Sequence, residues 1–153
     1  MKAHGKKTLD QAMKDALTLN VSGFLSREEA VLFAYLYGSF LEERPFGDVD
    51  VATYVDPARL RNPDRIFDYG ISLAAKMDLA ISGVTVDLRL LNVAPVPFRF
   101  NVITTGRVVF SRSEKERIDF EVKTRSLYFD FLPHINFYYK SIVLGAEDGS
   151  FRK

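Results

Sequence analysis

The chain has 153 residues, of which 47% are hydrophobic, so it has the size and composition of one ordinary soluble domain with a continuous core. Lys and Arg total 21 against 20 Asp and Glu, and this near-neutral balance gives no argument for binding to nucleic acid or an anionic membrane, so any attraction to phosphate must be local. The absence of cysteine excludes disulfides and thiolate metal sites and favours the cytoplasm, and no stretch has the apolar length of a secretion signal or a membrane span.

The N-terminal part of the chain predicts a short helix followed by a strand. Thr8-Leu9-Asp10-Gln11 has the form of a capping box, and apolar residues follow at helical spacing until Gly23 and Ser26 interrupt the pattern. The run 30–37, AVLFAYLY, is continuously apolar and ends at Gly38-Ser39. This pattern predicts a buried strand and a tight turn, with the end of a helix as the alternative.

A second strand is predicted at 48–55, DVDVATYV, and Asp56-Pro57 closes it. The alternation places Asp48 and Asp50 on one face of the strand and the valines on the other. Because two neighbouring carboxylates repel each other, this acidic face is expected to be exposed or to bind a cation.

The middle of the chain predicts a helix, a strand and then two short elements. Asn62-Pro63 suits the start of the helix and Gly83 its C-terminal stop. The segment 84–92, VTVDLRLLN, alternates apolar and polar residues, which predicts a half-buried strand with Asp87 on its polar face. The proline-flanked segment that follows predicts a short helix, a turn at Gly106 and a last short strand.

The C-terminal part predicts a long aromatic helix. Ser113-Glu114-Lys115-Glu116 is a second capping box, and the helix is expected to reach about Leu144 with a kink or break at Pro133. Its aromatic side chains spread more widely around the helix than one core-facing stripe requires, so a core helix and a partner-binding helix are both open. The order of elements predicts an α/β (α+β) sandwich with helices packed on a small mixed sheet.

Acidic residues on the two alternating strands form a candidate chemical site. If those strands are neighbours, Asp87 lies beside Asp48 and Asp50 on one face. Clustered carboxylate oxygens suit Mg²⁺, which proteins commonly share with substrate phosphates. The backbone N–H groups and the hydroxyl of the Gly38-Ser39 turn could hold such a phosphate. These are the components of a phosphoryl or nucleotidyl transfer site.

A salt bridge between Asp87 and Arg89, two residues apart on the same strand face, is the alternative that needs no ligand.

These segments resemble the signature of the minimal nucleotidyltransferases (MNT) of the DNA polymerase β superfamily, which is a Gly-Ser pair, a spacer, Asp-x-Asp and a later strand aspartate. The matching stretches are GSF at 38–40, DVDVATYV at 48–55 and VDLRLLN at 86–92. The likeness extends from about Ala30 to the C-terminal helix. The segments downstream of the motif are similar to those of the MNT antitoxins that pair with HEPN-domain toxins.

The resemblance implies a polymerase β-like nucleotidyltransferase fold, with 1–153 as a single domain, a core of about 26–112 and a C-terminal helical segment of about 113–145. It implies a Mg²⁺-dependent enzyme that uses ATP or another nucleoside triphosphate. The residues it assigns to catalysis and metal binding are Asp48, Asp50 and Asp87, and those it assigns to the nucleotide are Gly38 and Ser39.

The spacer from Phe40 to Gly47 is shorter than is usual in this family, which carries a small basic and glycine-containing loop there. Arg44 is the candidate that could replace one phosphate contact of that loop as a nucleotide-binding residue, with a solvated loop charge as the alternative.

By resemblance, the acceptor is a tyrosine hydroxyl on a HEPN toxin, which AMP transfer would silence, so the chain would act as a cytoplasmic antitoxin. A non-catalytic antitoxin, or a nucleotide-binding protein that inhibits its partner by binding, is the alternative. Transfer to RNA or to an aminoglycoside is less favoured, because the net charge is near zero and the chain is short. No membrane partner is expected, and self-association stays open.

Overall fold

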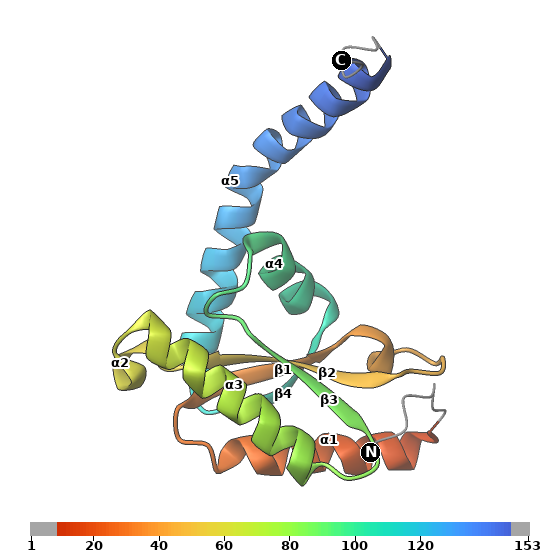
Figure 1. Cartoon of the computed structure of the whole chain (residues 1–153), viewed down its shortest axis with the longest axis vertical. Coiled ribbons are helices and arrows are strands. Elements are labelled where there is room, and N and C mark those ends of the chain that lie inside the picture. Colours follow the sequence, from red (N-terminus) through yellow and green to blue (C-terminus); the bar gives the residue numbers. More distant parts are fainter. Residues whose placement is uncertain (1–8, 148–153) are drawn as a thin grey trace.

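The structure is a computed structural model that describes residues 9–147, and the side chains up to residue 144. At its centre is a mixed four-stranded sheet with the strand order β3-β2-β1-β4 (Figure 1). Strand β1 (Val31–Tyr37) is antiparallel to β2 (Asp48–Val55) and to β4 (Arg107–Ser111), and β2 is parallel to β3 (Thr85–Leu90). The predicted small mixed sheet is confirmed, as is the neighbouring position of the two alternating strands.

Helices cover both faces of this sheet. Helices α1 (Gln11–Ser26) and α3 (Pro63–Ala80) lie on one face, and α4 (Val96–Thr105) and the first half of α5 (Glu114–Glu147) lie on the other (Figure 1). A single turn of helix, α2 (Pro57–Leu60), follows β2. The alternation of side chains along each strand divides the core into two clusters, one per face.

Side-chain caps begin the two helices of the first face. The Asp10 carboxylate accepts a hydrogen bond from the Met13 N–H at the start of α1, and the Asn62 amide oxygen accepts one from Arg65 at the start of α3. The capping role predicted for Thr8 lies outside the described residues. The cap at Asn62, followed by Pro63, is confirmed.

The predicted interruption of the first helix is wrong at Gly23, through which α1 continues, and is confirmed at Ser26, where α1 ends. A glycine inside a helix costs about 1 kcal/mol relative to alanine. Burial of Leu17, Val21 and Leu25 against the sheet outweighs that cost.

The helix predicted to stop at Gly83 ends earlier, at Ala80, and Ile81 is its C-cap. Gly83 has a φ of +84° in the turn that leads into β3, where glycine adopts this angle without strain. The last strand and the turn at Gly106 are confirmed.

The long C-terminal helix begins at the predicted capping box, where the Ser113 hydroxyl accepts a hydrogen bond from the Glu116 N–H at 3.3 Å. Of the predicted kink or break at Pro133, the structure shows a kink. Helix α5 continues through Pro133 to Glu147, and Figure 1 shows its axis changing direction part-way along. Neither this helix nor any other in the described part of the chain has the length and apolar character to cross a membrane.

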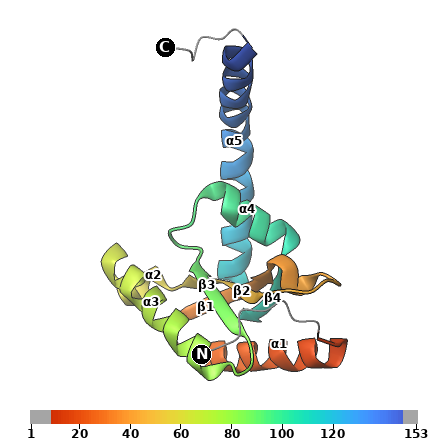
Figure 2. The same ribbon diagram turned by 45° about the vertical axis from the view of Figure 1, so that its right-hand side comes forward.

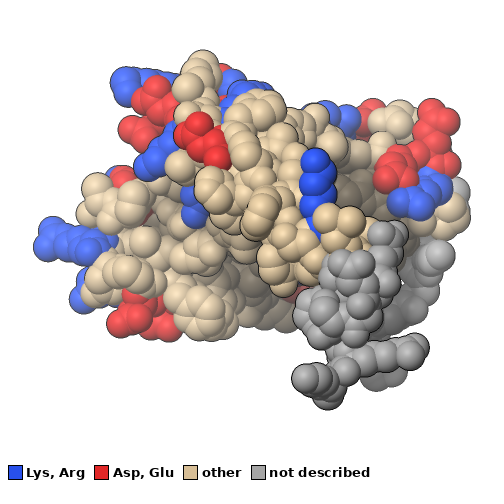
Figure 3. Space-filling view, turned by 90° about the horizontal axis from the view of Figure 1, so that it is seen from above, with Lys and Arg blue, Asp and Glu red and all other residues tan. Residues whose placement is uncertain are grey.

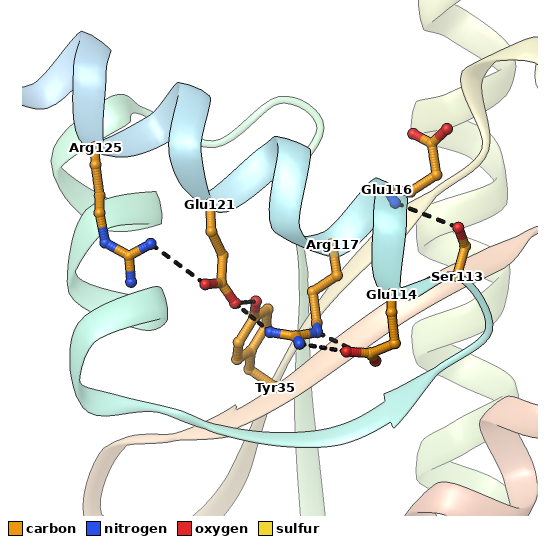
Figure 4. Close-up of polar contacts among 7 residues, drawn as sticks. All are labelled: Tyr35, Ser113, Glu114, Glu116, Arg117, Glu121 and Arg125. Carbon is orange, nitrogen blue, oxygen red and sulfur yellow. Dashed lines mark hydrogen bonds and ion pairs between the residues drawn. The ribbon is translucent and has the colours of Figure 1, made fainter.

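A polar network holds the first half of α5 on the sheet (Figure 4). The Tyr35 hydroxyl of β1 donates to Glu121 at 2.6 Å, and Arg117 donates to the same carboxylate at 2.6 Å. Arg117 also pairs with Glu114, and Arg125 with the second oxygen of Glu121. The pKa of Tyr35 is raised because burial and the neighbouring Glu121 carboxylate both disfavour the phenolate.

The two halves of α5 differ in their surroundings. Phe120 and Thr124 are buried against the sheet side, and the Tyr128 ring stacks on Phe100 of α4 with centroids 3.7 Å apart. Beyond this contact the helix stands clear of the body, and its aromatic side chains are exposed (Figures 1 and 2). The core interpretation therefore describes the first half of the helix and not the second.

Candidate active site

The register between β2 and β3 brings the predicted carboxylates to one edge of one sheet face. Asp50 lies directly opposite Asp87, and Asp48 lies two residues along the same strand, opposite Thr85. All these positions are half-buried. Because directly paired residues point to the same face, the carboxylates project on the side that α4 and α5 occupy.

The Gly38-Ser39 turn lies against this acidic edge. Tyr37 pairs with Asp50 across β1 and β2, and Gly38 follows with a φ of +73° at the start of a short 3₁₀ helix, η1 (Gly38–Leu41). A Cβ atom on Gly38 would lie 2.5 Å from the Asp50 carboxylate oxygen Oδ2. Only glycine satisfies both the backbone angle and the close approach, so this residue determines how near the turn comes to the carboxylate.

The charges at the site act on one another. The pKa of Asp50 is raised, chiefly because burial disfavours its ionised form, and then because Asp87 and Asp48 add negative charge beside it; the guanidinium of Arg89 partly offsets these effects. Burial, followed by the charge of Asp50, raises the pKa of Tyr37 to about 12. The site therefore favours an added positive charge.

Arg89 supplies the nearby cation. Its Nε atom lies 3.6 Å from Oδ2 of Asp87, and its guanidinium carbon lies 5.5 Å from the centre of the Phe98 ring on α4. Its side chain is 59% exposed, so it can reorient toward a ligand. The salt bridge considered from the sequence is present, but the sequence reasoning missed that this cation also faces Asp50. The signal was available in the alternation of the strand, which puts Arg89 on the acidic face.

Arg44 lies elsewhere. It forms an ion pair with Glu42 on the exposed loop and lines a cavity of about 210 Å³ together with Gln11 and Lys14 of α1. Lys14 holds this loop from the α1 side, donating to the carbonyl of Phe40 at 2.9 Å and to that of Glu42 at 2.7 Å. Nucleotide binding by Arg44 stays a prediction.

Comparison with known proteins places this geometry in a family. The model of the family described as polymerase beta, nucleotidyltransferase matches residues 20–115, which include the whole sheet and the acidic edge. The chain belongs to the polymerase beta nucleotidyltransferase family. No curated protein gives a significant match to the sequence.

Solved structures share the fold of this nucleotidyltransferase family member. A chain from the complex of a tri-AMPylated Shewanella oneidensis HEPN toxin with an MNT antitoxin aligns with a TM-score of 0.62 and 20% identity, over 86% of this chain and 99% of the other. A chain from a toxin–antitoxin structure with AMP-PNP aligns with a TM-score of 0.60 and 21% identity, over 82% and 98%. A third, from a structure described as the toxin–antitoxin MntA-HepT, aligns with a TM-score of 0.60 and 19% identity, over 84% and 98%.

The acidic edge of this family member is not preassembled as a metal site. Within residues 9–147, no three acidic or histidine side chains are already close enough together to hold an ion. Mutual repulsion and the pairing of Asp87 with Arg89 are forces that keep the carboxylates apart. The donor set still suits a hard cation, because its oxygen ligands project from one face and the pKa of Asp50 is raised by burial and then by its anionic neighbours.

Proposed function

We propose that the chain is a Mg²⁺-dependent nucleotidyltransferase that moves AMP from ATP to a tyrosine hydroxyl of a HEPN toxin, and so acts as an antitoxin. The observation that carries the proposal is the pairing of Asp50 with Asp87 directly beside the Gly38 turn. Membership of the nucleotidyltransferase family supports the reaction type.

The donor and the acceptor are proposed from the fold neighbours. One of these structures contains AMP-PNP, and another contains a tri-AMPylated HEPN toxin together with its MNT antitoxin. A triphosphate needs a cationic site beside a backbone turn, and this chain provides Arg89 and the Gly38-Ser39 turn at the acidic edge.

The proposed metal ligands are Asp48, Asp50 and Asp87. Bound Mg²⁺ would neutralise charge on the phosphates and lower the pKa of the acceptor hydroxyl. The chain itself provides the positions of the ligand oxygens, which the two paired strands hold on one face.

The protein's own groups account for orientation. Gly38 lets the turn approach the carboxylates, and the N–H groups and hydroxyl at Gly38-Ser39 bind the terminal phosphates. Arg89 turns from Asp87 to a phosphate oxygen, because a doubly charged phosphate attracts the guanidinium more strongly than one carboxylate does. In the transfer, the tyrosine oxygen bonds to the α-phosphorus, pyrophosphate leaves with the electrons of the broken P–O bond, and a carboxylate of the cluster takes the phenol proton.

The test is intact-mass spectrometry of the toxin after incubation with the chain, ATP and Mg²⁺. We expect a gain of one or more AMP units with the natural chain and a loss of transfer of about 1,000-fold or more with Asp50→Asn. Asp68→Asn, which changes an exposed carboxylate on α3, is the matched control and should transfer normally. Undiminished transfer by Asp50→Asn would refute the role of the carboxylates.

Inhibition by binding alone is the second candidate, and the exposed distal half of α5 favours it, because this surface offers contacts that are independent of the aspartates. A variant with all three aspartates changed to asparagine separates the two functions. If it still neutralises the toxin in cells as well as the natural chain does, binding is sufficient. If neutralisation is lost while the complex persists, transfer is required.

A further inference from the structure

The distal half of α5 continues the helix face that packs against the body. At about 3.6 residues per turn, the row formed by Phe120, Thr124 and Tyr128 continues as Phe131, Ile135, Tyr138 and Ile142. The first members of this row contact the sheet side and α4, and the later members lie beyond the body. The same face therefore changes from a packed surface to an unpartnered one within a single helix.

A second row beside the first changes its character. In the anchored half it carries Arg117, Glu121 and Arg125, the polar network of Figure 4. In the distal half the same row carries Leu132, Tyr139 and Val143. Together the two distal rows form what we call the distal arc, which consists of Phe131, Leu132, Ile135, Tyr138, Tyr139, Ile142 and Val143.

The distal arc is wider around the helix than the apolar stripe through which two helices pair. It spans about 140° of the helix circumference, whereas a coiled-coil seam is a narrower stripe. A single neighbouring helix would cover one row and leave the other in water. A concave apolar groove, of the kind that two packed helices form, covers both.

The size and charge of the arc also indicate a protein partner. Tyr138 is 65% exposed, Tyr139 63% and Val143 55%. A large side chain has a surface of about 200 Å², so at these exposed fractions the arc presents about 600 Å² to solvent. This is most of the roughly 800 Å² that each partner contributes to a standard interface. Lys140 is the one Lys, Arg, Asp or Glu between Phe131 and Leu144, so the complementary groove is expected to be apolar. Figure 3 shows mostly uncharged side chains in the middle of the molecule seen from above.

We infer that the distal arc inserts into an apolar groove between helices of the toxin and places the toxin beside the catalytic face. The arc lies on the side of α5 that carries α4, and Figure 1 shows the distal half leaning toward that side. This is the sheet face from which Asp50 and Asp87 project. The inference rests on the toxin partner of the proposed function but not on the transfer chemistry.

Three consecutive exposed aromatic residues provide the test. Tyr138 lies on one row of the arc and Tyr139 on the other, whereas Phe137, 74% exposed, lies outside the arc. We expect Tyr138→Ser and Tyr139→Ser each to weaken toxin binding by about tenfold or more, and Phe137→Ser by less than about twofold. Binding is measured by calorimetry in the Asp50→Asn background without nucleotide, and circular dichroism checks that each variant keeps its helix content.

Three results would overturn the inference. If Phe137→Ser weakens toxin binding as much as the tyrosine variants do, binding does not depend on the face that carries the arc. If only one tyrosine variant weakens binding, the helix pairs with a single helix. Dissociation of a dimer of this chain by the tyrosine variants, with toxin binding unchanged, would assign the arc to a second copy.

The transfer assay separates this inference from the proposed activity. If the natural chain transfers no AMP but binds toxin through both tyrosines, the docking inference stands and the activity fails. If it transfers AMP while neither tyrosine variant binds more weakly, only the docking inference fails. Absence of any binding by the natural chain would overturn the docking inference.

Discussion

The two faces of the sheet differ in what their side chains do. The face toward α1 and α3 is closed by mostly aliphatic residues, with Leu73 and Met77 of α3 almost fully buried. The face toward α4 and α5 combines an aromatic cluster with an edge that carries the half-buried Asp48, Asp50 and Asp87. One sheet thus gains stability from one side and presents charged groups on the other, so substitutions on the two faces should affect different measurements.

The largest effect on stability is expected on the closed face. Leu73→Ala removes a side chain that is 1% exposed and should lower the free energy of unfolding by about 2–5 kcal/mol. Leu79→Ala on the same helix, where the side chain is 83% exposed, should change it by less than about 0.5 kcal/mol. Urea denaturation measures both, and similar costs for the two variants would contradict the burial argument.

The turn at the acidic edge should respond to a single methyl group. Gly38→Ala places a Cβ 2.5 Å from the Asp50 carboxylate at a φ of +73°, so transfer should fall about 100-fold, with a stability loss of about 1–2 kcal/mol. Gly23→Ala in α1, where no atom lies within 4 Å of the new Cβ, should stabilise the protein by up to about 1 kcal/mol. Normal transfer by Gly38→Ala would contradict the close approach of the turn to the site.

The link between the sheet and α5 should have a smaller cost. Tyr35→Phe removes the 2.6 Å hydrogen bond to Glu121 but leaves the two arginines on that carboxylate. The free energy of unfolding should fall by about 1–2 kcal/mol. Tyr138→Phe, which changes an exposed ring, is the control and should be neutral in the same denaturation experiment.

The smallest effect is a pH dependence at Asp50. Because the folded protein raises the pKa of this carboxyl, the folded state binds a proton more readily than the unfolded chain does. The Asp50 contribution to stability is therefore present below its ordinary pKa and is lost as the pH rises through the raised value. Asp50→Asn should be more stable than the natural chain at neutral pH by less than about 1 kcal/mol, since the site is partly solvated.

Thermal denaturation of both proteins from acidic to neutral pH measures this difference. It should shrink on acidification, and addition of Mg²⁺ should stabilise the natural chain more than the variant. A difference that does not vary with pH would show that the fold does not raise the pKa of Asp50.

The sequence predicted the parts of this fold that depend on local pattern. Alternation located β2 and β3 and put Asp48, Asp50 and Asp87 on polar strand faces, and capping residues located the starts of α3 and α5. Whether these three aspartates meet at one edge depends on the order of the strands, which the local sequence pattern does not determine. In the structure, the parallel pairing of β2 with β3 brings them together.

Features that depend on tertiary contact could not be predicted in this way. Glycine and proline commonly interrupt helices. Burial of its apolar face nevertheless keeps α1 helical through Gly23, and α5 continues through Pro133. Gly70 in α3 gave no local signal, although its missing side chain lets the helix approach Leu90 of β3, where a Cβ would lie 2.4 Å from a methyl carbon. The orientation of Arg89 toward Asp50 and Phe98 likewise depends on the packing of α4.

The strand order also predicts how the acidic edge behaves when the protein opens locally. Asp48 and Asp50 are on β2, which has hydrogen-bonded neighbours on both sides, whereas Asp87 is on β3 at the edge of the sheet. Amides of central strands exchange with solvent through rarer openings than those of edge strands. Asp87 can therefore leave the cluster without global unfolding, and a cation shared between the two strands would slow hydrogen exchange in β3 more than in β2.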